Sequence, residues 1–552
     1  MTNTIELNKE RLEALVKADP QRKWVLDTET DGLDVIGTDA PHGAHWIGLM
    51  PQGTGHCFVL SRREFDEWAR PIVEQMHLIG HNLLFDMHAL NLTPAGYTDT
   101  MLGSYFINTS SRIGMDSIAK RLGYPKIETP DALKKGQIAY MDRAELTDYL
   151  VDDVRFTDIM YQKINWQPNM ELDMRVGQAI YSMESRGVRL LGDRLSKAHT
   201  ELLGIVDKTL QELRDVGMEG DPNSPKQVAA FLMSKGRKLP ITEKGNVSTS
   251  KLVLQRMADK GDDLAAKILA YRKAIKLDSS FLKPLPKIAR NGVLYPQTNI
   301  SGTVTGRFSC SKPNLQQIPK RGALGKSLRR CMTSVSGTGV TACDYSQVEL
   351  RVAAAMADEP TLLEAFANGG DPHTEVAAKM LGKKAEDITP EERYKAKAVN
   401  FGILNGMGAR RLAIELKSDY DEANRFLSEY KRNLPHLSAW MEGVWRQAET
   451  FGIVRTLSGR TRVFSGDDST RPSISVVVQG TAAELIRHAI VGAHEAGLPL
   501  MLSVHDEILV EGDHRNQLKE IMEDCANKAF PEVLGKVSFT AEATYGETWG
   551  DT

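Results

Sequence analysis

A polar group between two apolar runs near the C-terminus constrains this chain most. The runs occupy residues 500–502 and 508–510, and His505, Asp506 and Glu507 lie between them. Short apolar runs broken by a turn predict a β-hairpin packed on a core. Such a hairpin presents two adjacent carboxylates at its tip, where like charges repel unless a cation lies beside them. The pair indicates a divalent metal, with a solvated turn as the alternative.

A second stretch, residues 340–351, favours the metal. A short apolar strand ends there at Asp344, and Gln347, Glu349 and Arg351 follow it. Aspartates at the ends of two strands that are distant in the chain can meet over one pair of metal ions. Ions held in this way stabilise the attacking and the leaving oxygen of a phosphoryl transfer. The two stretches together therefore predict two-metal phosphoryl-transfer chemistry.

Whole-chain composition sets the broad class of protein. The 552 residues are 26% charged and 41% hydrophobic, as in ordinary soluble proteins of about two to four domains. The polar N-terminus lacks a signal core and no apolar run approaches membrane-spanning length, so no membrane association is expected. The cysteines form no CxxC pair, which argues against a zinc site or disulfide framework and indicates a reducing, cytoplasmic compartment. They are Cys57, Cys310, Cys331, Cys343 and Cys525.

The net charge of −3 does not suggest nucleic acid, but the distribution of charge does. Between Asp278 and Asp344 there is no acidic residue, whereas ten residues are basic. A long basic segment beside a predicted metal site indicates a polyanion ligand, with a solvated basic face as the alternative. The ten are Lys283, Lys287, Arg290, Arg307, Lys312, Lys320, Arg321, Lys326, Arg329 and Arg330.

Three acidic segments precede residue 165. An apolar strand carries Asp27 and Glu29 on one face, because side chains alternate along a strand. A second strand gives way to a helix with Asp86, and a later helical segment places Tyr149 and Asp153 on one face. Paired acids on an apolar strand are costly without a cation, so a second metal site is predicted.

The middle of the chain has helical patterns. Residues 170–285 are predicted to be helical throughout, with Ser224 as an N-cap and Pro225 as the first residue of one helix. Farther on, Arg393, Lys397, Phe401 and Asn405 recur every fourth residue and share one helix face. Two bases followed by an aromatic ring suit a triphosphate with its sugar or base beyond. An amphipathic core helix is the alternative.

Together these motifs resemble the family A DNA polymerases, the DNA polymerase I family, joined to a DEDD-type 3′–5′ exonuclease of the Tyr subtype. Residues 340–351, 393–407 and 502–511 resemble polymerase motifs A, B and C, and residues 303–319 and 546–551 resemble further segments. The resemblance implies an α/β (α+β) fold. An RNase H-like exonuclease domain would precede a right-hand polymerase domain with an antiparallel palm sheet and helical fingers and thumb.

The resemblance also implies domain limits. We expect the exonuclease at residues 1–165 and the polymerase at residues 166–552. The expected thumb is about 185–290, the palm about 291–360 and 446–552, and the fingers about 361–445. With 26 residues before Asp27, we expect no separate 5′ nuclease domain, which suggests a phage-type enzyme acting in the host cytoplasm. We expect a monomer, and no long insertion indicates a docking loop for a processivity factor.

Residue roles follow from the match to family motifs. Asp344 and Asp506 would hold two Mg²⁺, with Glu507 beside them and Lys397 as the general acid for pyrophosphate. The remaining implied dNTP-binding residues are Arg393, Phe401, Glu349, Gln347, His373 and Asn405. Those implied to contact primer–template DNA are Arg307, Gln317, Arg471, Gln479, His505 and Arg351. In the exonuclease, Asp27, Glu29, Asp86 and Asp153 would hold two further Mg²⁺ or Mn²⁺ ions at a single-stranded 3′ end, and Tyr149 would position water.

The chain departs from the family pattern at a few positions, among them Phe308, Cys310, Gln317 and Ser475. Asn405 stands where a tyrosine is usual beside the templating base, and Phe401 in place of tyrosine implies poor use of dideoxynucleotides. Three rival functions stay open. They are a stand-alone exonuclease, a single-subunit RNA polymerase, against which Glu349 argues, and an inactive nucleic-acid clamp, which predicts missing carboxylates.

Overall fold

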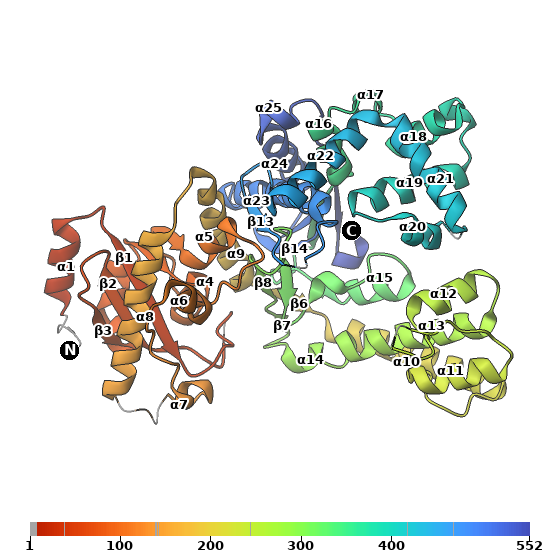
Figure 1. Ribbon diagram of the computed structural model, residues 1–552. Helices are drawn as coiled ribbons and strands as arrows, with labels where there is room; N and C mark the ends of the chain where they lie inside the picture. The colour runs from red at the N-terminus through yellow and green to blue at the C-terminus, as the bar shows by residue number, and fades with distance from the viewer. Residues whose placement is uncertain are drawn as a thin grey trace.

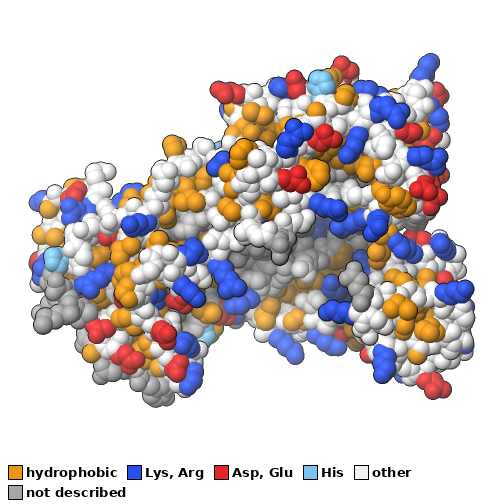
Figure 2. Space-filling view, viewed as in Figure 1, with side chains coloured by type: hydrophobic (Ala, Val, Ile, Leu, Met, Phe, Trp, Pro, Cys, Tyr) orange, Lys and Arg blue, Asp and Glu red, His pale blue; other side chains and the backbone are white. Residues whose placement is uncertain are grey.

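The computed structural model describes residues 8–552 except residues 38, 139–140, 142, 243, 417 and 467. An N-terminal α/β unit lies at one end of the molecule (Figure 1, red and orange). The remainder forms two lobes, one built from α10–α13 and one from α16–α22, on either side of the C-terminal sheet. The space-filling surface is hollowed between these lobes, and Lys and Arg side chains gather at the margins of the hollow (Figure 2).

The N-terminal unit is a five-stranded sheet in the order β3-β2-β1-β4-β5. Strand β1 is antiparallel to β2 and parallel to β4, and α8 packs on β1 and β2 through a core that includes Val25, Leu150 and Val154. The elements are α1 (Lys9–Ala18), β1 (Lys23–Thr30), β2 (Ala44–Pro51), β3 (Phe58–Ser61), α2 (Arg62–Glu64), α3 (Arg70–Val73), β4 (His77–Gly80), α4 (Leu83–Leu90), β5 (Gly96–Asp99), α5 (Thr100–Ile107), α6 (Met115–Leu122), α7 (Asp131–Lys134) and α8 (Arg143–Lys163).

Helix α9 (Glu171–Arg186) joins the two halves, since it contacts α4 and β5 on one side and α23 and β14 on the other. Strand β6 (Val188–Leu190) follows it and corrects the helical pattern expected over residues 170–285 at this point, because residues 188–190 pair with β7 and β10. Ser224 caps α11 and Pro225 begins it, as predicted. The next elements are α10 (Gly192–Asp215), α11 (Pro225–Ser234), α12 (Lys251–Asp259), α13 (Asp263–Leu277), α14 (Leu285–Ile288), β7 (Val293–Leu294), β8 (Gln297–Asn299) and β9 (Ser309–Ser311).

The C-terminal region contains a four-stranded antiparallel sheet in the order β14-β15-β11-β16. The predicted hairpin is present, but its turn is only His505 and Asp506. Glu507 belongs to β15, where it pairs in register with Asp344 of β11, so it does not lie at the tip. The elements are α15 (Ala323–Arg329), β10 (Met332–Thr333), β11 (Val340–Tyr345), β14 (Leu500–Val504), β15 (Glu507–Glu511), α24 (Arg515–Lys528), α25 (Pro531–Leu534) and β16 (Ala541–Gly546).

The lobe between β11 and β14 is helical. Helix α19 starts with a capping box between Thr389 and Glu392, with Pro390 at its first turn, and ends at Leu404, so Asn405 is its C-cap. The elements are α16 (Val348–Ala357), α17 (Pro360–Ala367), α18 (Pro372–Leu381), α19 (Pro390–Leu404), α20 (Ala409–Glu415), α21 (Tyr420–Asn433), α22 (Pro435–Phe451), β12 (Ile453–Arg455), β13 (Thr461–Val463) and α23 (Ser473–Glu495).

Helix α23 is long and apolar enough to span a membrane by length and composition, which the sequence did not lead us to expect. It is nevertheless a core helix, since 83% of its most apolar window is buried. Its Arg487 is fully buried beside Asp173 of α9, which also accepts two hydrogen bonds of 2.9 Å from Arg460.

Candidate active sites

The first acidic site lies on the N-terminal sheet. Asp27 and Glu29 share one face of β1, and Asp153 comes from α8, which packs across that face. One carboxylate oxygen from each of these three residues lies within 4.8 Å of the others. Asp86, on α4, accepts a hydrogen bond of 2.6 Å from Thr28 Oγ1. Hard carboxylate oxygens at this spacing suit a divalent cation.

Burial dominates the electrostatics of this cluster. It raises the pKa of Glu29 to about 8, that of Asp86 to about 7 and that of Asp153 to about 6. The pKa of Asp27 is also raised, first by burial and then by the neighbouring carboxylates. Asp86 is not among the three acids whose oxygens lie within 4.8 Å of one another, but its charge also raises the pKa of Asp27. A cation would strongly stabilise such a group of acids.

Tyr149 and Lys126 complete this site. The Tyr149 hydroxyl lies 3.1 Å from Thr129 Oγ1. Lys126 Nζ lies 2.8 Å from Asp153 Oδ1 and 4.7 Å from the centre of the Tyr149 ring. Lys126 was not predicted from the sequence, because it follows a proline in a segment of mixed polarity between α6 and α7 and no local pattern marks it.

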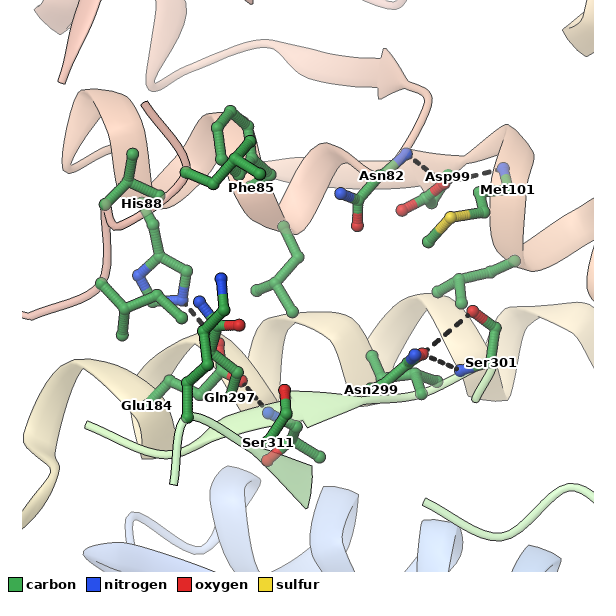
Figure 3. A pocket seen from close by; sticks show the side chains of 18 of the residues that line it. Asn82, Phe85, His88, Asp99, Met101, Glu184, Gln297, Asn299, Ser301 and Ser311 are labelled. Carbon is green, nitrogen blue, oxygen red and sulfur yellow. Dashed lines mark hydrogen bonds and ion pairs between the residues drawn. The ribbon is translucent and has the colours of Figure 1, made fainter. Parts of the chain in front are cut away.

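A cavity of about 470 Å³ separates the N-terminal unit from the strand β8 region (Figure 3). Asn82, Phe85 and Asp99 line it from the α4 side, and Gln297 and Asn299 line it from the opposite side. Phe85 precedes Asp86 on α4, but none of the four acids lines this cavity. Its lining combines an aromatic ring with amide side chains, which suits a polar ligand with a flat apolar face.

The second acidic site lies on the four-stranded sheet. Asp344, Asp506 and Glu507 line one cavity of about 310 Å³, together with Gln317 and His505. Lys320 Nζ donates hydrogen bonds of 2.7 Å to Asp344 and 3.0 Å to Glu507. The structure thus brings together acids from β11 and from the β14–β15 hairpin around a positive charge. Lys320 lies in the predicted basic segment, but the sequence did not indicate its role.

Arg307 and Glu349 border the same site. Arg307 donates a hydrogen bond to Glu349 and lies 3.7 Å from Asp506 Oδ1. Burial raises the pKa of Asp506 and that of Glu349, and the guanidinium of Arg307 opposes both shifts. Arg307 and Glu349 come from separate segments of the chain, and through Arg307 the pair lies beside Asp506.

The residues that flank motif A have structural contacts. Gln347 adopts a left-handed conformation with φ of 54° just before α16. Arg351 donates hydrogen bonds to the Ser346 and Ser538 carbonyls and lies over the Phe366 ring. The Arg351 guanidinium is therefore held by contacts within the protein, which does not support the prediction that it binds DNA directly.

The basic row on α19 lies in the helical lobe. Arg393 makes a two-pronged ion pair with Asp371, at 2.8 and 2.9 Å. Lys397 lies 5.9 Å from the ring centre of Phe401, which is 36% exposed. Of the two basic residues described here, Arg393 is paired with a carboxylate and Lys397 contacts an aromatic ring. The sequence had not indicated that Asp371 pairs with it.

His373 and Asn405 have internal partners. Buried His373 lies 2.9 Å from Asn400 Nδ2, and burial lowers its pKa to about 4, so it is neutral at neutral pH. Gln479 Nε2 donates a hydrogen bond of 2.7 Å to Asn405 Oδ1, which links α19 to α23. Arg471 is exposed just before α23. The structure therefore places the candidates in an acidic cluster on the N-terminal sheet, an acidic cluster on the C-terminal sheet and a row on α19.

Comparisons with known proteins identify the family. The sequence profile described as DNA polymerase family A matches residues 192–551, and that described as 3′-5′ exonuclease matches residues 4–167. The chain belongs to DNA polymerase family A and carries a 3′–5′ exonuclease domain ahead of the polymerase region. The predicted fold class is thereby confirmed.

Individual relatives agree. DNA polymerase I from Pseudomonas aeruginosa is 32% identical over 97% of this chain and 64% of its own length. The thermostable DNA polymerase I from Thermus aquaticus is 35% identical over 90% of this chain, and one from Thermus thermophilus is 32% identical over 85%. The chain spans 56% to 64% of the length of these three relatives.

A solved structure has the same fold. The POL domain of Pol1 from M. smegmatis, in complex with DNA primer-template and dNTP, superimposes with a TM-score of 0.85 and 22% sequence identity. The match covers 99% of each chain.

Proposed function

We propose that this chain is a template-directed DNA polymerase that extends a primer 3′-OH with dNTPs and proofreads with a 3′–5′ exonuclease. The observation that carries the proposal is the palm cavity, in which Asp344 and Asp506 face one space although they lie far apart in the chain. Membership of the polymerase family, and relatives named DNA polymerase I, support the same activity.

The palm acids fit two Mg²⁺ ions. Asp344 and Glu507 already converge on the ammonium of Lys320, so the donor set accepts positive charge at this point. Asp344 and Asp506 would hold the ions, and Mn²⁺ can substitute because it also prefers oxygen ligands. When bound, the ions would lower the pKa of the primer hydroxyl and neutralise charge on the leaving pyrophosphate.

The residues of the chain supply orientation and proton transfer. Arg393 and Lys397 would hold the triphosphate, and Lys397 would protonate the pyrophosphate as it leaves. Phe401 would stack on the nucleotide, while Glu349 would crowd the sugar 2′ position and so exclude ribonucleotides. Gln347, His373 and Asn405 complete the proposed nucleotide site.

The proposed DNA contacts lie around the palm. Arg307, Gln317 and His505 surround the palm acids and would contact the primer end. Arg471 and Gln479, at the start and on the first turns of α23, would contact the template. We keep Arg351 in this group only as a supporting residue, because its side chain is held by backbone carbonyls.

The exonuclease site would hydrolyse a single-stranded 3′ end. Asp27, Glu29, Asp86 and Asp153 would hold two Mg²⁺ or Mn²⁺ ions, and Tyr149 would position the attacking water. The cavity next to α4 would receive the terminal nucleotides, with Phe85 stacking on a base and Asn82 and Asn299 donating hydrogen bonds.

We propose a division at residues 165 and 166, with the thumb, palm and fingers at the limits given above. The two family matches, which end at residue 167 and begin at residue 192, support this division. We further propose a monomeric enzyme of the bacterial cytoplasm. Its five cysteines are free thiols, and four of them are buried, which suits a reducing compartment.

Extension of a labelled primer–template in Mg²⁺, with and without dNTPs, tests the proposal. The wild-type protein should lengthen the primer with dNTPs and shorten it without them. Asp506→Ala should lose extension alone. Shortening under both conditions would identify a stand-alone exonuclease, and binding without turnover would identify an inactive clamp.

A further inference from the structure

Lys126 is a buried lysine inside the exonuclease site. It lies between α6 and α7, and its side chain is only 6% exposed. Its Nζ is 2.8 Å from Asp153 Oδ1 and 3.5 Å from Asp116, whose side chain is 79% exposed. Burying an ammonium group is costly unless it is paired with an anion, and Asp153 is the buried carboxylate that offsets this cost.

The segment around Lys126 is fixed to α8 on both sides of the lysine. The Tyr124 hydroxyl donates a hydrogen bond of 2.8 Å to Asp152, and the Ile127 backbone N–H donates another of 2.8 Å to the same carboxylate. The Tyr124 ring also stacks on buried Phe156. The backbone is therefore anchored, so Lys126 could leave Asp153 only by a movement of its side chain, whose Nζ also donates a hydrogen bond of 3.3 Å to the Ile127 carbonyl.

Asp153 has two competing uses. It is one of the three carboxylates whose oxygens lie within 4.8 Å of one another, together with Asp27 and Glu29. A cation held by all three would occupy the electrostatic position that the Lys126 ammonium now takes beside Asp153. Two positive charges this close in a buried site repel each other, so a metal ion on Asp153 would weaken the contact between Lys126 and Asp153.

We propose that Lys126 is a built-in competitor of the exonuclease metal: its ammonium neutralises the carboxylates until a divalent ion displaces it. This inference rests on the proposed exonuclease function of the site. Because the backbone anchors keep the lysine nearby, its effective concentration stays high and metal binding becomes an exchange. The exonuclease would thus need more metal than the same carboxylates without the lysine.

The test is Mn²⁺ binding measured by electron paramagnetic resonance, in an Asp344→Asn background that weakens the palm site. Lys126→Met should bind Mn²⁺ about tenfold more tightly, because a competing charge next to a ligand has been removed. Lys126→Arg keeps the charge and should bind nearly as the parent does. Lys120→Met, which removes an exposed lysine of α6, should leave the affinity unchanged.

Equal or weaker Mn²⁺ binding by Lys126→Met would overturn the inference and leave Lys126 as a scaffold residue. The exonuclease assay is read separately on the wild-type protein. Absence of shortening there would refute the proposed function, whereas an unchanged affinity in Lys126→Met would refute only the competition.

Because Lys126→Met leaves buried acids unpaired and can misfold, the wild-type protein provides a second test. Reductive methylation followed by mass spectrometry should find Lys126 protected in metal-free protein and modified at saturating Mn²⁺. Lys120 should react equally in both conditions. Continued protection of Lys126 at saturating Mn²⁺ would show that no displacement occurs.

Discussion

The exonuclease and palm sites each place a lysine against carboxylates, but in different solvent environments. In the exonuclease site the side chains of Asp153 and Lys126 are 8% and 6% exposed. In the palm the side chains of Asp344 and Lys320 are 40% and 58% exposed. Both pairs consist of a lysine ammonium and an aspartate carboxylate, but the palm pair is far more exposed to water.

This difference indicates how one chain could tune two proposed metal sites separately. In the buried cluster desolvation controls ionisation, so protons, the lysine and metal compete closely for the same oxygens. In the open palm site water and salt screen the same interactions. We therefore expect the exonuclease to respond more strongly to pH and to loss of charge than the polymerase does.

The largest expected effect separates the two sites. Asp344→Ala should lower primer extension about a thousandfold or more, because a metal ligand is worth several kcal/mol in the transition state. It should leave 3′–5′ shortening intact. Asp27→Ala should have the reverse effect, in the same gel assay. Loss of both activities from either change would mean that the sites are not independent.

Acidification should inhibit the exonuclease more than the polymerase. Glu29, Asp86 and Asp153 have pKa values raised to about 8, 7 and 6, so they take up protons as the pH falls from about 8 to 6. Protons then compete with metal, and shortening should fall about tenfold per pH unit at subsaturating Mg²⁺. The rates of shortening and of extension should be measured from pH 6 to 9. Equal pH dependence of the two activities would contradict this prediction.

Removing one buried charge should stabilise the protein without metal. The pKa of Glu29 is higher in the folded chain than in the unfolded chain, so its contribution to stability is present at low pH and is lost as the pH rises through about 8. Glu29→Gln should therefore increase the free energy of unfolding in EDTA by about 2 kcal/mol at pH 9, and by less at pH 6. A higher melting temperature of the variant would show this. Asp344→Asn, at the exposed site, should change little.

The smallest effect is expected at Lys320. The side chains of Lys320 and Asp344 are largely solvent-exposed, although that of Glu507 is buried, so Lys320→Met should change the Mg²⁺ dependence of extension only about twofold. The change should vanish at high salt. A shift as large as that expected for Lys126→Met in Mn²⁺ binding would show that exposure does not govern the competition.

Much of the fold could be predicted from the sequence, because strand periodicity and family motifs are local signals. The strands carrying Asp27 and Asp344, the helix carrying Arg393 and the hairpin around Asp506 are all present. The lysines beside the acids could not be predicted in the same way. Lys126 and Lys320 meet their partners only through tertiary packing, and no spacing in the sequence encodes those contacts.

Two smaller differences between the predicted and the observed structure have the same origin. Strand β6 lies within a stretch of helical pattern and is specified by its pairing with β7 and β10 rather than by its own residues. Glu507 reads as part of a polar turn, yet pairing with Asp344 draws it into the sheet. In both cases a long-range hydrogen-bond register overrides the local pattern.

Helix α9 has a consequence for how the molecule unfolds. It packs on the exonuclease elements α4 and β5 and also on the palm elements α23 and β14, and its Asp173 is buried against Arg460 and Arg487. Melting the C-terminal half would break these buried ion pairs, and melting the N-terminal half would expose the part of α9 that packs on α4 and β5. The two halves therefore form one cooperative unit, and scanning calorimetry should record a single heat-absorption peak rather than two.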